Sequence, residues 1–465
     1  MIFFASLSAI LFYFSTGFYD YWLLTWLAPL PLCLYSLQAK AAKTALASFV
    51  AFILGALNQF GYLPLLLFFS TTLLSATAFT LAILLFRSTF RSMNQPLAPL
   101  AFASAWTAYE FIQSQLSSLG TLESLAYTQV LNLPIIQLAS VTGIWGITFL
   151  LMLLPASLAA IWHIHSNGDA WRIPALVVGG LLTIVVLFGF YRLYGPTVSP
   201  VMTIGLAAVP TTFEELRSQD PTTVNNSLQH YIDKITPLAN TGAQLVLFPE
   251  KIAFLAPSAQ ATGLSLLSQA AQKNHVALVV GLSLQKEKLH NTALAFGPDG
   301  SLLDSYDKQH LLSPYENSYS PGQALTILPS NDTATAGLAI CKDMDFSLPA
   351  MKYSQKGAGL LLVPALDFHT DGWLHARVAI LRGVEGNFAV ARAAQWGLLT
   401  VSDSRGRLLG TASTSNQGAG LVVQTPLSSG DSLYSRLGDW FAWLCLLGTA
   451  FTMYRLAYRL KSLYA

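Results

Sequence analysis

Residues 243–250 read AQLVLFPE, an apolar run that ends in Pro249 and the carboxylate of Glu250. Runs of the same kind recur along the second half of the chain, as VMTIGLAAV, VALVVGLSL, NTALAFGPDG, ATAGLAICKD, AGLLLVPAL and FAVARAAQWG. Stretches of helical length separate several of them. Near-continuous apolar strands that alternate with helices are typical of an α/β domain with a buried sheet. We therefore predict an α/β domain over residues 200–430.

The stretches between these runs predict four helices, near residues 223–238, 258–274, 346–356 and 371–386. The segment NTALAFGPDGSLLDSYDK contains a Pro-Asp-Gly turn between two strand-like runs, which indicates a hairpin. No internal repeat interrupts this pattern.

The first half of the chain has a different composition. Of all residues, 53% are hydrophobic and only 10% are charged, whereas a soluble domain has about 25% charged residues. Residues 1–199 hold only 10 of the 48 charged side chains. A bilayer core requires about 20 mostly apolar residues for each helical crossing. Eight stretches meet this requirement, near residues 2–19, 21–37, 43–62, 64–86, 96–115, 134–162, 173–194 and 437–456.

The positions of lysine and arginine predict the orientation of these spans. With a cytoplasmic N-terminus, the basic loops and the C-terminal tail all lie inside, as the positive-inside rule requires; they carry Lys40, Lys43, Arg87, Arg91, Arg172, Arg455, Arg459 and Lys461. We thus predict a seven-helix bundle over residues 1–199, an extracytoplasmic domain over 200–430, and an eighth helix with a cytoplasmic tail over 431–465. The first two spans are short, so a re-entrant hairpin is an alternative for them. Glu110, in the fifth span, should face protein or a watery cavity.

Composition also excludes some classes of function. A net charge of +2 argues against a nucleic-acid partner, because such proteins carry a clustered basic excess. No phosphate-binding loop or dinucleotide fingerprint is present, so we expect no cofactor. Neither the pair His163/His165 nor the pair His369/His375 has a carboxylate or cysteine at ligand spacing, so we expect no metal.

Three polar residues in the α/β domain follow strand-like runs. Glu250 ends LVLFPE, Lys308 follows the hairpin in SYDKQHLLSPYE, and Cys341 ends the apolar run in AGLAICKDMDF. In α/β proteins, ligands bind at the carboxyl ends of the strands, and catalytic residues often lie there. A cysteine becomes a nucleophile as its thiolate, which a neighbouring base and a positive charge can favour. Each of the three also has an ordinary structural explanation when taken singly.

Together, the phrases FPE, YDKQHLLSPYE and ICKDMDF resemble the nitrilase, or carbon–nitrogen hydrolase, superfamily, which carries a Glu–Lys–Cys triad in this chain order on an αββα sandwich. A domain of this type after seven spans and before a last one is similar to the apolipoprotein N-acyltransferase family. The stretch GTLESLAYTQVLNLPIIQLASVTGIWGITFLL at 120–151 agrees with that family in outline, as does RGVEGNFAVARAAQWG at 382–397.

This resemblance implies an acyltransferase of the bacterial inner membrane, multi-pass, with its catalytic domain on the periplasmic side. Cys341 would take an acyl chain from a phospholipid as a thioester. The α-amine of a diacylglyceryl-modified cysteine at a lipoprotein N-terminus would then accept the acyl chain. Glu250 would be the general base, and Lys308 would stabilise the oxyanion. We expect a monomer.

Supporting residues follow from the same resemblance. Glu316 matches a family glutamate that orients the lysine region. Lys342 and Asp343 stand where the family usually has Tyr-Glu, and we predict supporting or substrate-binding roles for them. Phe248 replaces a tryptophan that usually precedes the Pro-Glu pair. The change beside Cys341 leaves open an acyltransferase with a different amine acceptor. A membrane-tethered amidase or hydrolase, in which water resolves the thioester, and a non-enzymatic scaffold are further alternatives.

Overall fold

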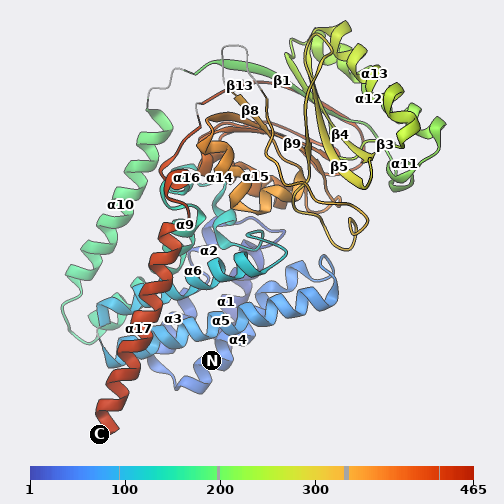
Figure 1. The fold of residues 1–465 in the computed structure, drawn as a ribbon. Helices are drawn as coiled ribbons and strands as arrows, with labels where there is room; N and C mark the ends of the chain where they lie inside the picture. Colours follow the sequence, from blue (N-terminus) through green and yellow to red (C-terminus); the bar gives the residue numbers. More distant parts are fainter. Residues whose placement is uncertain (94, 196–198, 329–334, 429, 465) are drawn as a thin grey trace. The chain divides into compact units, whose positions relative to one another are not determined.

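A computed structural model describes residues 1–93, 95–195, 199–328, 335–428 and 430–464. The chain divides into two compact units, which we call the helical unit and the catalytic unit (Figure 1). The helical unit comprises Met1–Gly195 and Leu437–Ala465, and the catalytic unit comprises Pro196–Arg436.

The helical unit consists of apolar helices and short turns. Its helices are α1 (Ile2–Ser15), α2 (Trp22–Thr25), α3 (Leu30–Gln38), α4 (Ala41–Ala56), α5 (Leu65–Ser92), α6 (Ala98–Leu116), α7 (Leu133–Ile136), α8 (Ala139–Thr142), α9 (Ile144–Ser166), α10 (Arg172–Tyr194) and α17 (Trp440–Tyr464). Within the described residues, four helical segments are long and apolar enough to cross a membrane by length and composition: Ala41–Gln59, Leu65–Ser92, Ile144–Ser166 and Arg172–Tyr194. They overlap four of the eight expected spans.

Two of the expected spans are interrupted, which corrects their boundaries. The stretch 21–37 forms two short helices, because Pro29 directly precedes α3 and its ring removes a backbone donor. The stretch 134–162 forms α7, α8 and only then α9. The break falls at Gly143, whose φ of 66° lies in the left-handed region that glycine adopts without strain. A hydropathy pattern does not register either break, because apolar residues continue through both.

The catalytic unit contains two mixed sheets. The first has the order β13-β1-β2-β4-β5-β6, with β3 paired to β4, and the second has the order β12-β11-β10-β9-β8-β7. The strands are β1 (Val201–Ala208), β2 (Leu245–Leu247), β3 (Phe254–Leu255), β4 (Ala277–Gln285), β5 (Leu289–Phe296), β6 (Leu302–Asp307), β7 (Ile327–Leu328), β8 (Thr335–Leu338), β9 (Ala358–Leu366), β10 (Ala389–Gln395), β11 (Leu398–Ser402), β12 (Leu408–Ser413) and β13 (Ala419–Pro426). The seven expected strands are confirmed as β1, β2, β4, β5, β8, β9 and β10.

The helices of this unit are α11 (Phe213–Arg217), α12 (Pro221–Asn240), α13 (Pro257–Asn274), α14 (Ser347–Gln355), α15 (Gly372–Gly386) and α16 (Leu433–Leu437), and they include all four expected helices. Helices α12 and α13 contact the first sheet, and α14 and α15 contact the second. One apolar cluster joins α12 and α13 to the first sheet, and it includes Leu228, Leu267 and Val280. A second cluster contains inward-facing residues of both sheets, such as Leu247 and Leu362. The two sheets therefore share one core.

The direction of the strands places the candidate catalytic residues at the carboxyl edge of each sheet. In the first sheet β1, β2 and β4 are parallel, and β6 runs in the direction of β4 because two antiparallel pairings separate them. Glu250 follows β2 and Lys308 follows β6, so both leave the sheet at its carboxyl edge. In the second sheet β8 and β9 are parallel, and Cys341 follows β8.

Candidate active site

The position of Glu250 depends on contacts with both sheets. After β2, the Phe248 N–H donates to the Val279 carbonyl at 2.9 Å, and the Glu250 N–H donates to the Ala365 carbonyl of β9 at 3.2 Å. Gly281 of β4 allows this approach, because a Cβ at that position would lie 2.6 Å from the Glu250 Cα. Glu250 is therefore buried and fixed at its backbone before any side-chain contact forms.

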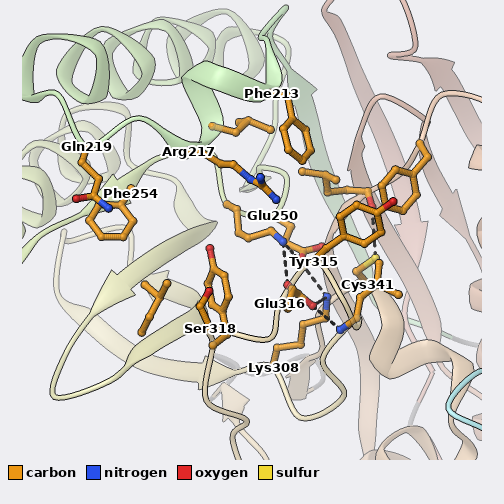
Figure 2. A pocket seen from close by; sticks show the side chains of 17 residues that line it. Phe213, Arg217, Gln219, Glu250, Phe254, Lys308, Tyr315, Glu316, Ser318 and Cys341 are labelled. Carbon is orange, nitrogen blue, oxygen red and sulfur yellow. Dashed lines mark hydrogen bonds and ion pairs between the residues drawn. The ribbon is translucent and has the colours of Figure 1, made fainter.

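Lys308 bridges two buried carboxylates. Its Nζ lies 3.0 Å from Glu250 Oε1 and 2.9 Å from Glu316 Oε2, as the dashed lines in Figure 2 indicate. Burial acts to lower the pKa of Lys308, but the charges of Glu250 and Glu316 raise it well above its ordinary value. Lys308 is thus a cation within the site. The N–H of Gly322 donates to the Lys308 carbonyl at 2.9 Å, and the Pro-Gly pair at 321–322 thereby holds the lysine backbone.

Glu316 anchors the other side of the lysine. Its carboxylate accepts hydrogen bonds from Lys251 Nζ at 2.8 Å, Asn291 Nδ2 at 2.7 Å and the Leu312 N–H at 2.8 Å. Burial alone would raise its pKa, but the two lysines hold the pKa of Glu316 well below its usual range. An orienting role for Glu316 is consistent with these contacts, because they fix the ammonium group of Lys308.

Cys341 begins a short 3-10 turn, Cys341–Asp345, directly after the strand β8 and two further residues. Its φ of 44° lies in the left-handed region, which a cysteine adopts only where the surroundings impose it. The thiol lies within 3.6 Å of the Leu366 carbonyl and lines a cavity. Burial raises the pKa of the Cys341 thiol to about 12; the charge of Glu250 acts in the same direction and that of Lys308 in the opposite one.

A cavity of about 340 Å³ brings the three residues together (Figure 2). Glu250, Lys308, Glu316 and Cys341 all line it. Glu250 Oε1 accepts hydrogen bonds from Lys308 Nζ and Asn291 Nδ2, whereas Glu250 Oε2 is buried and has no hydrogen-bond partner within the described residues. A carboxylate oxygen in this state can accept a proton from a neighbouring group. The remaining walls are mostly apolar and include Phe213, Phe254, Leu289, Leu312, Leu366 and Phe368.

Lys342 and Asp343 have other surroundings and do not line this cavity. The Lys342 ammonium lies 3.7 Å from Asp345 Oδ2. Asp343 accepts hydrogen bonds from the Tyr306 hydroxyl at 2.8 Å and from backbone N–H groups, including that of His310 at 2.9 Å. These contacts tie the turn after Cys341 to the segment that carries Lys308. A substrate-binding role for Lys342 and Asp343 remains a prediction, and the contacts favour support of the turn.

Several residues of the site were not predicted. Lys251 and Asn291 donate hydrogen bonds to Glu316, and Lys251 lines the cavity together with Arg217, Tyr315 and Tyr319. Asn291 begins the segment NTALAFGPDG, which was predicted as a strand, but its side-chain contacts were not predicted. Lys251 directly follows the Pro-Glu pair, with a φ of 53°, and nothing local indicates that its side chain reaches Glu316.

One cluster outside the cavity has the composition of a metal site. The ligand atoms of Asp367, Asp371 and His375 lie within 4.8 Å of one another, so the sequence-based expectation overlooked two carboxylates near His375. Arg392 forms an ion pair with Asp367. Burial acts to lower the pKa of His375, but Asp345 and Asp371 raise it to about 10. In this structure, Arg392 and His375 form ion pairs with the buried carboxylates of Asp367 and Asp371. The absence of a metal remains a prediction.

Comparisons with known proteins agree with the two-part architecture. Residues 215–427 match the family model for carbon–nitrogen hydrolases, and residues 8–157 match the model for the N-terminal domain of apolipoprotein N-acyltransferase. The apolipoprotein N-acyltransferase of Geobacter metallireducens is 26% identical over 404 residues, which cover 78% of this chain and 75% of the relative. That of Haemophilus ducreyi is 23% identical over 480 residues, or 94% of this chain and 93% of the relative.

Two further comparisons concern the catalytic unit alone. Omega-amidase NIT2 of Mus musculus is 32% identical over 171 residues, which cover 32% of this chain and 61% of the relative. The crystal structure of an amidase from Nesterenkonia sp. is similar with a TM-score of 0.42 and 26% identity, over 48% of this chain and 90% of that one.

A carbon–nitrogen hydrolase domain with a cysteine in its cavity, joined to a unit of apolar helices, defines the class as a membrane-associated enzyme of the nitrilase superfamily. The matches over both units specify it further. The chain belongs to the apolipoprotein N-acyltransferase family and is an acyltransferase.

Proposed function

We propose that this acyltransferase moves an acyl chain from a membrane phospholipid to the α-amine of the lipidated N-terminal cysteine of lipoproteins, through a thioester on Cys341. Glu250, Lys308 and Cys341 carry out the reaction in this proposal, and Glu316 positions the lysine. The observation that supports it most directly is the state of Glu250. One of its oxygens accepts hydrogen bonds from Lys308 and Asn291. The other is buried and has no hydrogen-bond partner among the described residues, and Glu250 lines the same cavity as Cys341.

In the first step, Glu250 Oε2 accepts the thiol proton while Sγ of Cys341 attacks the ester carbonyl of the phospholipid. The S–C bond forms, and the carbonyl oxygen gains a negative charge that the Lys308 ammonium stabilises. The ester C–O bond then breaks. The leaving glycerol oxygen takes the proton from Glu250 and departs as a lysophospholipid, so that Cys341 is left as a thioester. The high pKa of the thiol makes this coupled proton transfer necessary at neutral pH.

In the second step, the α-amine of the acceptor attacks the thioester carbonyl, and the N–C bond forms as the C–S bond breaks. Glu250 accepts the proton that the amine loses and returns it to the thiolate. The conversion of ester to thioester to amide ends in the most stabilised acyl group, so the transfer needs no nucleotide. The apolar walls of the cavity slow the competing attack by water.

The mass of Cys341 after purification from membranes tests this proposal. Intact-protein and peptide mass spectrometry should find a long-chain acyl increment on Cys341, which disappears when a diacylglyceryl-modified lipopeptide is added and reappears on that peptide as an amide. Cys341→Ser with the same purification is the matched control. An unmodified Cys341 in the presence of phospholipid, with the protein folded, would contradict it.

An amidase or hydrolase is the second candidate, because omega-amidase NIT2 shares 32% identity over 171 residues. Water would then resolve the acyl enzyme. Rapid release of free fatty acid from the thioester in detergent, without an amine acceptor, would favour this candidate over the transferase. An acyltransferase with a different amine acceptor was suggested by the Lys342-Asp343 pair, but neither side chain lines the cavity.

We further propose that the chain crosses the bacterial inner membrane eight times as a monomer, with residues 200–430 on the periplasmic side. The basic loops support this orientation, and the shared core of the two sheets supports the αββα sandwich that the family resemblance implies. Single cysteines at two exposed positions test the orientation. A membrane-impermeant maleimide should label Asp299→Cys in intact spheroplasts, and should label Asp169→Cys only after lysis. The opposite pattern would reverse the proposed orientation.

A further inference from the structure

Arg217 is a cation of the active-site cavity that the reaction described above does not use. It ends α11, a short helix that begins with a capping box between Thr212 and Glu215. The Arg217 guanidinium carbon lies 4.1 Å from the centroid of the Phe213 ring, and both side chains line the cavity. Figure 2 shows Arg217 beside Phe213, directed toward the cavity.

A row of stacked rings holds this arginine in place. Phe213 stacks on Trp396 with ring centroids 5.7 Å apart, and His369 stacks on Trp396 at 5.2 Å. The indole N–H of Trp396 donates to the Thr211 carbonyl at 3.1 Å. Both Trp396 and His369 have φ values in the left-handed region, 56° and 66°. Backbone strain of this kind persists where surrounding contacts impose it, and it concentrates at functional sites.

The residues that line the cavity include more cations than carboxylates, and Arg217 is the cation that remains after the lysines are paired. Lys308 and Lys251 are both paired with Glu250 and Glu316, the only carboxylates among the lining residues. In the part of the chain that the structure describes, no carboxylate forms an ion pair with Arg217. Its guanidinium is exposed, so it retains donors for an anion from outside.

The ligand that fits this lining is both apolar and anionic. Aromatic rings and leucines line the cavity with Cys341, which suits an acyl chain, and the guanidinium of Arg217 suits two oxygens of a phosphate. A phospholipid carries both groups within one molecule, and a diacylglycerol lacks the anion. We propose, on the basis of the proposed function, that Arg217 binds the phosphate of the acyl donor and makes the enzyme select phospholipids over neutral glycerolipids.

The test compares two donors with the same acyl chains. The full-length protein in detergent is mixed with dioctanoylphosphatidylglycerol or with dioctanoylglycerol, and the rate of thioester formation on Cys341 is measured by intact mass. Arg217→Ala should lower the ratio of the two rates roughly 10- to 100-fold, through the KM for the phospholipid. Arg217→Lys should fall between, because an ammonium keeps the charge but not the two parallel donors. Lys234→Ala, which removes an exposed charge of α12, is the matched control.

Equal ratios in Arg217→Ala, Lys234→Ala and the unchanged protein would overturn the inference while thioester formation itself upheld the proposed function. An equal loss with both donors would also overturn it, since the arginine would then act on the chemistry. A measurement of lipid binding provides a second test that does not depend on the reaction. In Cys341→Ala, replacement of Arg217 by alanine should weaken binding of the phospholipid at least tenfold, and inorganic phosphate alone should bind far more weakly than the lipid. If Cys341 is never acylated but this binding difference appears, the proposed function fails and the anion site stands.

Discussion

The two units each bury a carboxylate, and they satisfy it in opposite ways. In the helical unit, Glu110 of α6 accepts four hydrogen bonds from neutral donors: Trp106 Nε1 at 2.9 Å, the Leu125 N–H at 3.1 Å, the Ser124 hydroxyl at 2.6 Å and the Thr148 hydroxyl at 2.8 Å. In the catalytic unit, Glu250 accepts a hydrogen bond from the ammonium group of Lys308, and its other oxygen has no hydrogen-bond partner in the part of the chain that the structure describes.

We interpret this difference as one between a structural acid and the proposed general base. All the donors around Glu110 are used, and they tie α6 to α9 and to the segment that contains Ser124 and Leu125. Its carboxylate therefore faces protein, as expected, and joins these segments within the helical unit. Glu250 keeps an oxygen available next to a cavity, and a fixed positive charge lies beside it. The proposed reactivity of Glu250 rests on the combination of this oxygen, the neighbouring cavity and the ammonium group of Lys308.

The largest expected effect is on Glu250. Glu250→Gln preserves the shape of the side chain but removes the proton acceptor, so acylation of Cys341 should fall roughly a hundred- to ten-thousandfold. Intact mass spectrometry after mixing with phospholipid measures the rate. Glu287→Gln, an exposed acid of the same unit, is the control and should leave the rate unchanged. A rate in Glu250→Gln within threefold of the control would show that Glu250 is as structural as Glu110.

Replacement of Glu110 should affect stability instead. Glu110→Ala leaves four donors without an acceptor, and the folded protein should lose about 3 kcal/mol or more. Thermal unfolding in detergent, followed by circular dichroism, measures the loss. Glu110→Gln retains an acceptor oxygen and should lose less. Acylation of Cys341 per folded molecule should change less than twofold in both variants. A selective loss of acylation in a stable Glu110→Gln protein would instead assign Glu110 to substrate binding.

Alkylation of Cys341 by iodoacetamide probes the charges around the thiol. Because the pKa of the thiol is raised to about 12 by burial and by Glu250, the rate should rise with each pH unit from 7 to 10 and should not level off near 9. Glu250→Gln removes a negative charge, lowers this pKa and should speed alkylation at pH 8. Lys308→Met should slow it. Each unit of change in the pKa corresponds to a factor of about ten. Effects of the opposite sign would refute the assigned electrostatics.

The smallest effect is expected at Lys342. Two buried lysines lie in the catalytic unit near the turn, but only Lys308 lines the cavity. Lys342→Met keeps the packing of the aliphatic chain and should alter the acylation rate by less than about threefold, whereas Lys308→Met should abolish the reaction. Initial rates at saturating lipid provide the comparison. A severe loss in a Lys342→Met protein with an unchanged melting temperature would restore the predicted substrate-binding role.

Much of the fold could be predicted because its strands are buried on both faces. A run such as AGLLLVPAL is apolar at every position, which predicts a buried strand, and it forms β9 over the same residues. The strands β3, β7, β11, β12 and β13 were not predicted. The strands β3 and β7 have two residues each, β11 has five, and β12 and β13 are partly exposed and so lack a continuous buried run. In the helical unit, composition identified apolar stretches but not the breaks at Pro29 and Gly143.

The sequence by itself determined the division into an apolar half and an α/β half, and the three phrases that contain Glu250, Lys308 and Cys341. These depend on local composition and on short-range order along the chain. Only the tertiary structure decided that Lys251 and Asn291 meet Glu316, and that Arg217 lies at the same cavity as Cys341. Such contacts join residues 25 to more than 60 positions apart. Strand pairing and the shared core of two sheets set them, and no local pattern encodes that geometry.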